Sequence, residues 1–110
     1  EGTHSIWEIV LHCTAWHRAV VRRVEGEPVD LDGEADWPPA TDQSGRAWRA
    51  AQDDLARSVH EVEKALLAFA APRLDEDVPG QAYTFAVMLH GLAGHDLYHA
   101  GQIALLKKAL

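Results

Sequence analysis

Cysteine is nearly absent from this sequence. Cys13 is the single cysteine among 110 residues, so the chain cannot form an internal disulfide bond. Small secreted domains usually depend on several such bonds, and the chain therefore gives no sign of an oxidising compartment. We expect a cytoplasmic protein.

Long apolar runs and clusters of basic residues are also missing. No stretch approaches the roughly 20 apolar residues that a membrane span needs. Lys and Arg number 10 against 17 Asp and Glu, which gives a net charge of −7. Binding to nucleic-acid phosphates requires clustered positive charge. The composition therefore predicts a protein with no membrane partner and no nucleic-acid partner.

The residues that are present indicate one folded domain. Hydrophobic residues make up 47% of the chain, a composition typical of folded rather than disordered proteins. The length fits a single domain over residues 1–110 with a modest core. Seven histidines are many for this size, and histidine is the commonest metal ligand among side chains.

The first helix is predicted from Ser5 to about Val24. Ser5 and Glu8 have the spacing of a capping box, in which each side chain bonds a backbone N–H group at the start of a helix. Apolar residues then recur three and four positions apart, as on a buried helix face: Ile6, Ile9, Cys13, Trp16 and Val20. His12 lies on the flank of this stripe.

Residues 25–42 predict a long loop, because they are rich in Gly, Pro and Asp and show no sustained period. Loops of this length are uncommon and often functional. Trp37 precedes two prolines in this segment, and we expect it to anchor the loop against the helices as a packing residue.

The second helix is predicted from Gln43 to Ala71, where Pro72 ends it. Its inner positions alternate by four and three residues, the pattern of helices that pack almost parallel or antiparallel. These positions are Trp48, Gln52, Leu55, Val59, Val62, Leu66 and Phe69. The opposite face is charged, and we expect it to be solvated.

The third helix is predicted to follow Pro79-Gly80 and to run to near Leu110. Its inner face shows the same alternation at Phe85, Met88, Leu92, His95, His99, Gln102 and Leu106. Two histidines and a glutamine thus occupy positions where aliphatic side chains are expected. Three long helices with two connections predict an all-α up-down bundle, which usually needs a fourth helix to close its core. That helix could precede residue 1 or come from another subunit.

His95 and His99 are the strongest candidates for metal ligands. Four positions separate them, which places both imidazoles on one helix face about 6 Å apart along the axis. Buried polar side chains are costly without partners, and one metal ion would satisfy both rings. The spacing alone is a weak signal, since any helix rich in histidine produces it. The alternative is that the two histidines lie at the edge of the seam, the line along which the helices pack, and are hydrogen-bonded to carboxylates and water.

A metal site needs a third ligand, and His12 is the histidine nearest the inner face of the first helix. Three histidines leave open positions for water or substrate, as in catalytic rather than structural sites. The other histidines fit less well. His90 and His17 lie five positions from His95 and His12, a turn of about 140°, His60 is expected to be exposed, and His4 precedes the first helix.

Other side chains near the candidate site have plainer expected roles. Cys13 is expected to be a buried, unreactive thiol, and Asp96 to point away from the seam, although carboxylates can orient metal-bound imidazoles. Trp16, Tyr98 and Gln102 could line a substrate pocket, but aromatic residues at helical spacing usually serve packing, and the glutamine could equally tie two helices together. No Ser-His-Asp grouping is evident, so a nucleophilic side chain has no support.

Three segments together resemble one family: MLHGLAGHDLYHAGQIALLKKA at 88–109, IWEIVLHCTAWHRAV at 6–20 and DWPP at 36–39. They are similar to the DinB/YfiT-like superfamily of metal-dependent enzymes, and the likeness covers nearly the whole chain. The resemblance implies a four-helix bundle in which three histidines hold a divalent metal, and residue by residue these fall on His12, His95 and His99. It also implies a long helix before the first one, for which this sequence has no counterpart.

The resemblance further implies an enzyme in which zinc, nickel, iron or manganese activates water or a low-molecular-weight thiol toward a small-molecule substrate. The reaction would be either S-transfer or hydrolysis. We expect the chain to form a homodimer. One alternative to the enzyme is a non-catalytic, stress-associated metal-binding bundle that acts as a dimeric interaction protein, and another is a family member without metal. Three protein ligands plus water would favour catalysis, whereas four protein ligands would favour a structural role.

Overall fold

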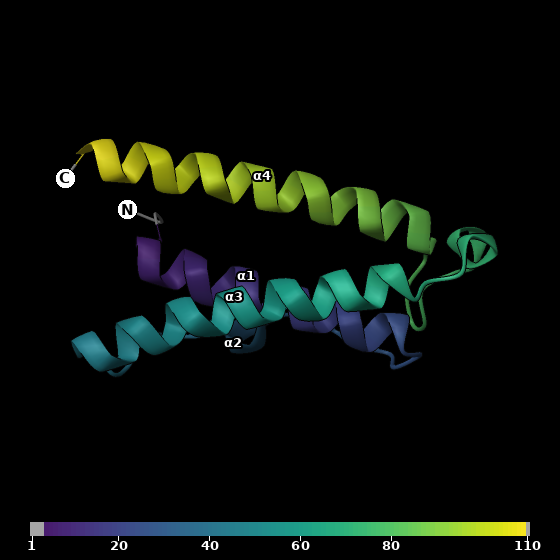
Figure 1. Cartoon of the computed structure of the whole chain (residues 1–110), viewed down its shortest axis with the longest axis horizontal. Helices are drawn as coiled ribbons and strands as arrows, with labels where there is room; N and C mark the ends of the chain where they lie inside the picture. The colour runs from purple at the N-terminus through teal and green to yellow at the C-terminus, as the bar shows by residue number, and fades with distance from the viewer. Residues whose placement is uncertain (1–3, 110) are drawn as a thin grey trace.

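The computed structural model describes residues 4–109, most of which lie in helices (Figure 1). In chain order these are α1 (Ile6–Val24), α2 (Gly33–Asp36), α3 (Gly45–Leu67), the 3-10 helix η1 (Ala71–Asp75) and α4 (Phe85–Ala109). Within residues 4–109 the β-structure is confined to an isolated bridge between Asp77 and Thr84. The predicted all-α bundle with three long helices is confirmed. None of these described helices combines the length and the apolar character needed to cross a membrane.

The capping box starts α1 as predicted. The Ser5 hydroxyl accepts a hydrogen bond from the Glu8 backbone N–H at 3.1 Å, and the Glu8 carboxylate accepts one from the Ser5 N–H at 2.9 Å. Arg22 and Arg23 lie in the last turn, where positive charge complements the helix dipole. The helix ends at Val24, so α1 spans the predicted residues.

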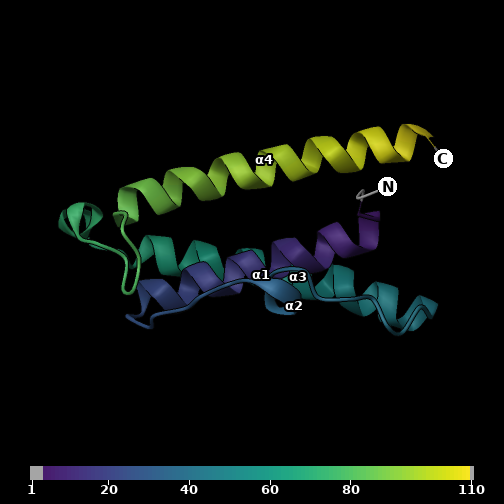
Figure 2. The ribbon, with the colours of Figure 1, turned by 180° about the vertical axis from the view of Figure 1, so that it is seen from behind.

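α1 packs against both other long helices, and α4 lies over it along most of its length (Figures 1 and 2). α1 and α3 run parallel, since His17 meets Ser58 and Trp7 meets Trp48, with 41 positions between the partners each time. α4 runs antiparallel to both. The connection between α1 and α3 therefore crosses back along the bundle, and the chain does not follow a simple up-down succession. No Cα atom of α3 lies within 8 Å of one in α4 over the described residues.

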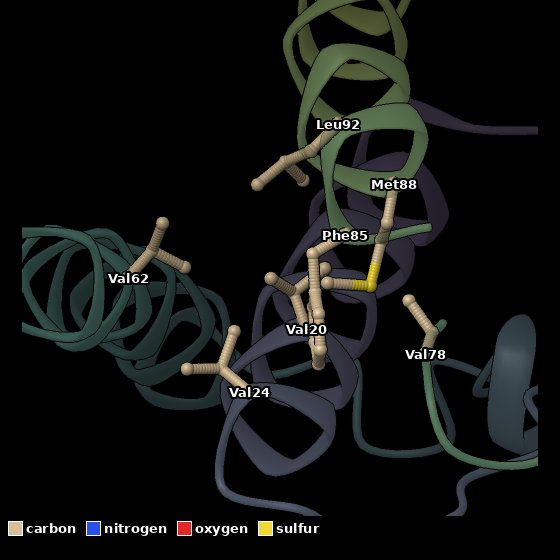
Figure 3. Packing of buried hydrophobic residues seen from close by; sticks show 7 residues of the cluster. All are labelled: Val20, Val24, Val62, Val78, Phe85, Met88 and Leu92. Carbon is tan, nitrogen blue, oxygen red and sulfur yellow. The ribbon is translucent and has the colours of Figure 1, made fainter. Parts of the chain in front are cut away.

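The apolar core gathers where α1 ends and α4 begins. Figure 3 shows its side chains converging from the three long helices and the turn before α4: Val20, Val24, Val62, Val78, Phe85, Met88 and Leu92. Phe69 packs edge-on against the ring of Phe85, with centroids 5.4 Å apart. Close packing of this kind fixes the position of α4 along the axis of α1. It therefore determines which α1 side chains lie opposite the histidines of α4.

The connection between α1 and α3 and the end of α3 differ in detail from the prediction. The expected loop at 25–42 contains α2, a single helical turn. α3 ends at Leu67 rather than Ala71. Pro72 lies inside η1, at one of its first two positions, where a missing backbone N–H and a fixed φ angle are tolerated.

α4 starts at Phe85, five residues later than Gly80. The segment before it forms a turn in which the Val78 N–H donates to the Tyr83 carbonyl at 2.9 Å, and the Phe85 N–H donates to the Glu76 carbonyl at 3.0 Å. Gly80 has a φ angle of 74°, a conformation that costs glycine little. The Pro-Gly pair therefore marks this turn rather than the helix start.

The buried face of α3 is rotated relative to the prediction. Val59 and Leu66 were expected on the inner face but are each 42% exposed, whereas Ala51, Ser58 and Val62 are buried. An alternation of three and four residues predicts one narrow stripe along a helix, but it does not specify which neighbouring helix that stripe will face. Over the described residues, α1 is the long helix that α3 contacts, so the buried stripe follows α1 alone.

Candidate metal centre

Three histidines from two helices meet between α1 and α4. They are the predicted ligands: His12 of α1, and His95 and His99 from successive turns of α4. One ring nitrogen of each lies within 4.8 Å of those of the others. The Nε2 atoms of His12 and His95 are 3.0 Å apart. Because metal–imidazole bonds are about 2.0–2.1 Å long, one ion between these two atoms can reach both.

The outer nitrogen of every imidazole is held by an oxygen acceptor. The three Nδ1 atoms donate as follows: His12 to the Asp36 carbonyl at 2.6 Å, His95 to Asp96 Oδ1 at 3.3 Å, and His99 to Gln102 Oε1. Since an oxygen acceptor places the ring proton on Nδ1, the lone pair of each Nε2 is free to bind a cation. The donor set therefore fits a divalent metal ion.

Two indole rings support the imidazoles from outside. Trp37 stacks on His12 with ring centroids 3.7 Å apart and planes within 1° of parallel, and Trp16 stacks on His95 at 4.2 Å and 19°. The loop residues Asp36 and Trp37 thus both hold His12, one by hydrogen bonding and one by stacking. The sequence indicated Trp37 as an anchor for the loop, but the Trp-Pro-Pro segment carries no signal that its partner is a ligand.

Burial disfavours protonation of two of the three histidines. It lowers the pKa of His12, although the hydrogen bond to Asp36 acts in the opposite direction. It also lowers the pKa of His99, against the opposing effect of the hydrogen bond to Gln102. A histidine must be neutral to bind a metal, so both side chains are ready to act as ligands near neutral pH.

A second group of metal-ligating side chains shares His95 with the first. It consists of Cys13, His95 and Asp96, whose ligand atoms also lie within 4.8 Å of one another. Burial raises the pKa of Cys13 to about 12, so the thiol keeps its proton at neutral pH, and a metal would have to displace it. This agrees with the expected buried, unreactive thiol. The three-histidine group is therefore the stronger candidate.

The predicted pocket residues lie in different surroundings. Tyr98 is 65% exposed and meets the ring of His99 edge-on at 5.2 Å. Gln102 is half-buried and holds His99. Trp16 lies against His95 and also lines a cavity of about 230 Å³ with Tyr83, Val87, Met88 and Gly91. A role for these three in binding a substrate stays a prediction.

The other four histidines lie outside the candidate metal centre. His60 and His90 are exposed. His4 precedes α1, and its ring stacks on the indole of Trp37 with centroids 3.6 Å apart. His17 is buried but is bonded to a different set of side chains.

His17 joins Ser58 and Asp96 in a grouping that the sequence did not reveal. Its Nδ1 lies 2.9 Å from Ser58 Oγ, and its Nε2 donates to Asp96 Oδ2 at 2.8 Å. The prediction that Asp96 points away from the seam is wrong, because its carboxylate bridges His17 and His95. Burial by itself would raise the pKa of Asp96, but the hydrogen bonds from the two histidines outweigh it and hold the pKa below its usual range.

The expectation that the chain has no Ser-His-Asp grouping therefore needs correction, although the conclusion drawn from it stands. Ser58 is 0% exposed, and its hydroxyl donates to the Leu55 carbonyl at 2.7 Å. A nucleophilic serine must reach the substrate and pass its proton to the histidine. Ser58 meets neither condition. The partners are 41 and 79 positions apart in the chain, so no local spacing could have indicated them.

The amino-acid sequence is similar to one known protein family. The profile of the DinB superfamily matches residues 1–103, a range that includes all three histidines. The chain belongs to the DinB superfamily. The resemblance inferred from the three sequence segments is thereby confirmed. No curated protein and no solved structure matches this DinB protein.

Proposed function

We propose that this DinB protein is a metal-dependent enzyme whose divalent ion is held by the Nε2 atoms of His12, His95 and His99. The observation that supports this most directly is the set of three Nδ1 hydrogen bonds to oxygen acceptors. With those protons directed outward, the Nε2 atoms of His12 and His95 face each other as two acceptors 3.0 Å apart. A shared cation stabilises such an arrangement.

Three protein ligands favour a catalytic role over a structural one. Catalytic zinc sites keep three protein ligands and leave a further position for water or substrate. When bound, the ion would lower the pKa of a coordinated water or thiol and so supply a nucleophile near neutral pH. Imidazole ligands suit zinc, nickel and iron, whereas manganese prefers oxygen ligands and is a weaker candidate.

The chain's own residues would orient the ligands and shield the site from water. The Asp36 carbonyl and the Gln102 side chain fix the rings of His12 and His99. Trp37 covers one face of His12. A site with rigid ligands and limited access to water strengthens the electrostatic effects on which this chemistry depends.

In this proposal the nucleophile is either water or a low-molecular-weight thiol, and the substrate is a small electrophilic molecule. In the thiol version, the thiol releases its proton to solvent, its sulfur forms a bond to the electrophilic carbon, and the leaving group departs with the electrons of the broken bond. The thiol must come from solution, because Cys13 is buried and burial raises its pKa to about 12. In the water version, oxygen takes the place of sulfur.

Metal analysis tests the site. Protein purified without added ions is expected to contain about one ion per chain, and the His12→Ala and His99→Ala variants are expected to lose it. His90→Ala is the matched control, since this histidine is exposed on the same helix as His99. Equal metal content in the wild type and in His12→Ala would overturn the proposed ligands.

An activity assay separates the two chemistries. The metal-loaded protein is incubated with an alkyl halide or an activated ester, with and without an added soluble thiol. Loss of thiol that requires metal supports S-transfer, and turnover without thiol supports hydrolysis. No turnover of either kind by protein that carries its full metal content would contradict the enzymatic part of the proposal.

A non-catalytic, metal-binding homodimer is the second candidate, favoured by an exposed stripe on α4. Val87, Tyr98 and Leu105 are exposed, and spacings of 11 and 7 residues place them on one helix face. Exposed apolar stripes can bind a partner helix. A dimer that Tyr98→Lys dissociates in light-scattering measurements, without metal-dependent turnover in the wild type, would favour this candidate over the enzyme.

A further inference from the structure

A chain of hydrogen bonds runs from α3 through α1 to the candidate metal centre on α4. It begins at the Leu55 carbonyl, which accepts from the Ser58 hydroxyl at 2.7 Å. Ser58 Oγ lies 2.9 Å from His17 Nδ1, and His17 Nε2 donates to Asp96 Oδ2 at 2.8 Å. The other carboxylate oxygen, Oδ1, accepts from His95 Nδ1 at 3.3 Å. Three helices are thus linked to one candidate ligand.

The inner part of this chain is fixed by burial. Ser58 is fully buried and His17 nearly so, and a buried polar group that loses its hydrogen-bond partner destabilises the fold. Each of the two therefore holds the other in one orientation. The outer part is different, because the side chain of Asp96 is 43% exposed and next to His95 in sequence. Without His17, solvent would compete for this carboxylate, and the bond that remains in the chain would be the 3.3 Å contact with His95.

We propose that His17 and Ser58 are positioning residues that lock the Asp96 carboxylate and thereby aim His95 Nε2 at the metal. This inference rests on the proposed function, since it assumes that His95 is a ligand. It adds a part for α3, which contributes no ligand to the three-histidine group. Acceptors that orient metal-bound imidazoles typically change metal affinity by 10- to 100-fold when they are removed. Here the acceptor, Asp96, is itself oriented by His17.

The test compares Zn²⁺ affinity in the full chain, measured by competition with a chromophoric chelator, and the visible absorption of the Co²⁺-loaded protein. His17→Leu removes both hydrogen bonds and is expected to weaken Zn²⁺ binding about 10- to 100-fold and to alter the Co²⁺ spectrum. His17→Gln keeps an amide N–H near the position of Nε2 and is expected to recover most of the affinity. Ser58→Ala is expected to have a smaller effect in the same direction.

Thr14→Val is the matched control. Thr14 is also a buried polar residue of α1, but its hydroxyl donates to the Val10 carbonyl of its own helix. This variant should therefore leave affinity and spectrum unchanged. Urea denaturation of each metal-free variant shows separately whether stability has changed, so that a general loss of folding is not mistaken for a loss of positioning.

The outcomes distinguish the two levels of the proposal. If the wild type binds no ion, the proposed function fails. If the wild type binds Zn²⁺ and folded His17→Leu binds it with equal affinity and an unchanged Co²⁺ spectrum, the metal site stands and the positioning role is overturned. Should His17→Leu not fold, Ser58→Ala and Asp96→Asn decide in its place, and wild-type affinity in both would overturn the positioning role.

Discussion

His12 of α1 and His95 of α4 face each other with their Nε2 atoms 3.0 Å apart. Each ring holds its proton on the far nitrogen, where the Asp36 carbonyl or the Asp96 carboxylate accepts it. Two lone pairs at this distance repel unless a proton or a metal ion lies between them. This relationship, more than the presence of seven histidines, is what indicates a metal site in the bundle.

Removing the indole of Trp37 should weaken metal binding without removing a ligand. An aromatic contact such as its stack on His12 contributes about 0.5–1.5 kcal/mol, so Trp37→Leu is expected to raise the Kd for Zn²⁺ about two- to tenfold. Trp48→Leu is the control, because Trp48 packs on Trp7 instead. Competition titrations of both variants measure the difference, and equal affinities would show that the stack does not hold the ligand.

Gln102 should matter for the metal through His99. Gln102→Ala removes the acceptor that keeps the proton on Nδ1 of His99, and the affinity for Zn²⁺ is expected to fall about 10- to 100-fold. Gln102→Glu retains an acceptor and should bind at least as tightly as the alanine variant. Gln43→Ala, an exposed glutamine before α3, provides the comparison for a change with no effect. Unaltered affinity in Gln102→Ala would count against the assigned tautomer.

The stability of the metal-free protein should fall as the pH drops below about 6.5. In the folded state, burial lowers the pKa values of His12 and His99 below 6.5, the ordinary value of a histidine. Just below pH 6.5 the unfolded chain therefore binds protons at these residues that the folded chain does not, and the free energy of unfolding decreases until the pH reaches the lowered values. Urea denaturation in the presence of a chelator, between pH 7.5 and 5.5, measures this slope.

The same pH series on two variants identifies the histidines responsible. His12→Gln should show a smaller decrease in stability than the wild type, because one of the two groups no longer titrates. His60→Gln should behave like the wild type, since this side chain is exposed. A slope that is the same in all three proteins would contradict the assignment.

Phe85 should be the most costly apolar side chain to truncate near the start of α4. It is almost fully buried and packs against Phe69, and Phe→Ala changes at such positions cost about 3–5 kcal/mol. Val87→Ala, two residues later and exposed, should change stability by no more than about 0.5 kcal/mol. Denaturant unfolding of both variants tests whether the core lies where Figure 3 places it.

The features that the sequence predicted are those encoded in local spacing. Ser5 and Glu8 form the predicted capping box, and the 3.6-residue repeat of α4 puts His95 and His99 on one face, toward α1. The third predicted ligand, His12, came from the same helical pattern. The capping box and the pair of histidines each depend on residues of one helix. The choice of His12 depends on the apolar face of α1, which another helix must cover.

The features that the sequence could not predict depend on contacts between distant segments. Asp36 lies 24 positions from His12, and nothing in the Asp-Trp-Pro-Pro segment specifies that its carbonyl and indole meet that ring. Asp96 turns back into the bundle because His17, 79 positions earlier, bonds its carboxylate. The rotation of α3 likewise reflects which helix it contacts, and its own alternation of three and four residues does not encode this.

X-ray absorption at the metal edge of the zinc-loaded protein tests the central claim most directly, because it identifies the ligand atoms. The three-histidine site predicts nitrogen and oxygen neighbours at about 2.0–2.1 Å, with the scattering pattern of three imidazole rings. A sulfur neighbour at about 2.3 Å would place the ion instead among Cys13, His95 and Asp96, and would contradict the account.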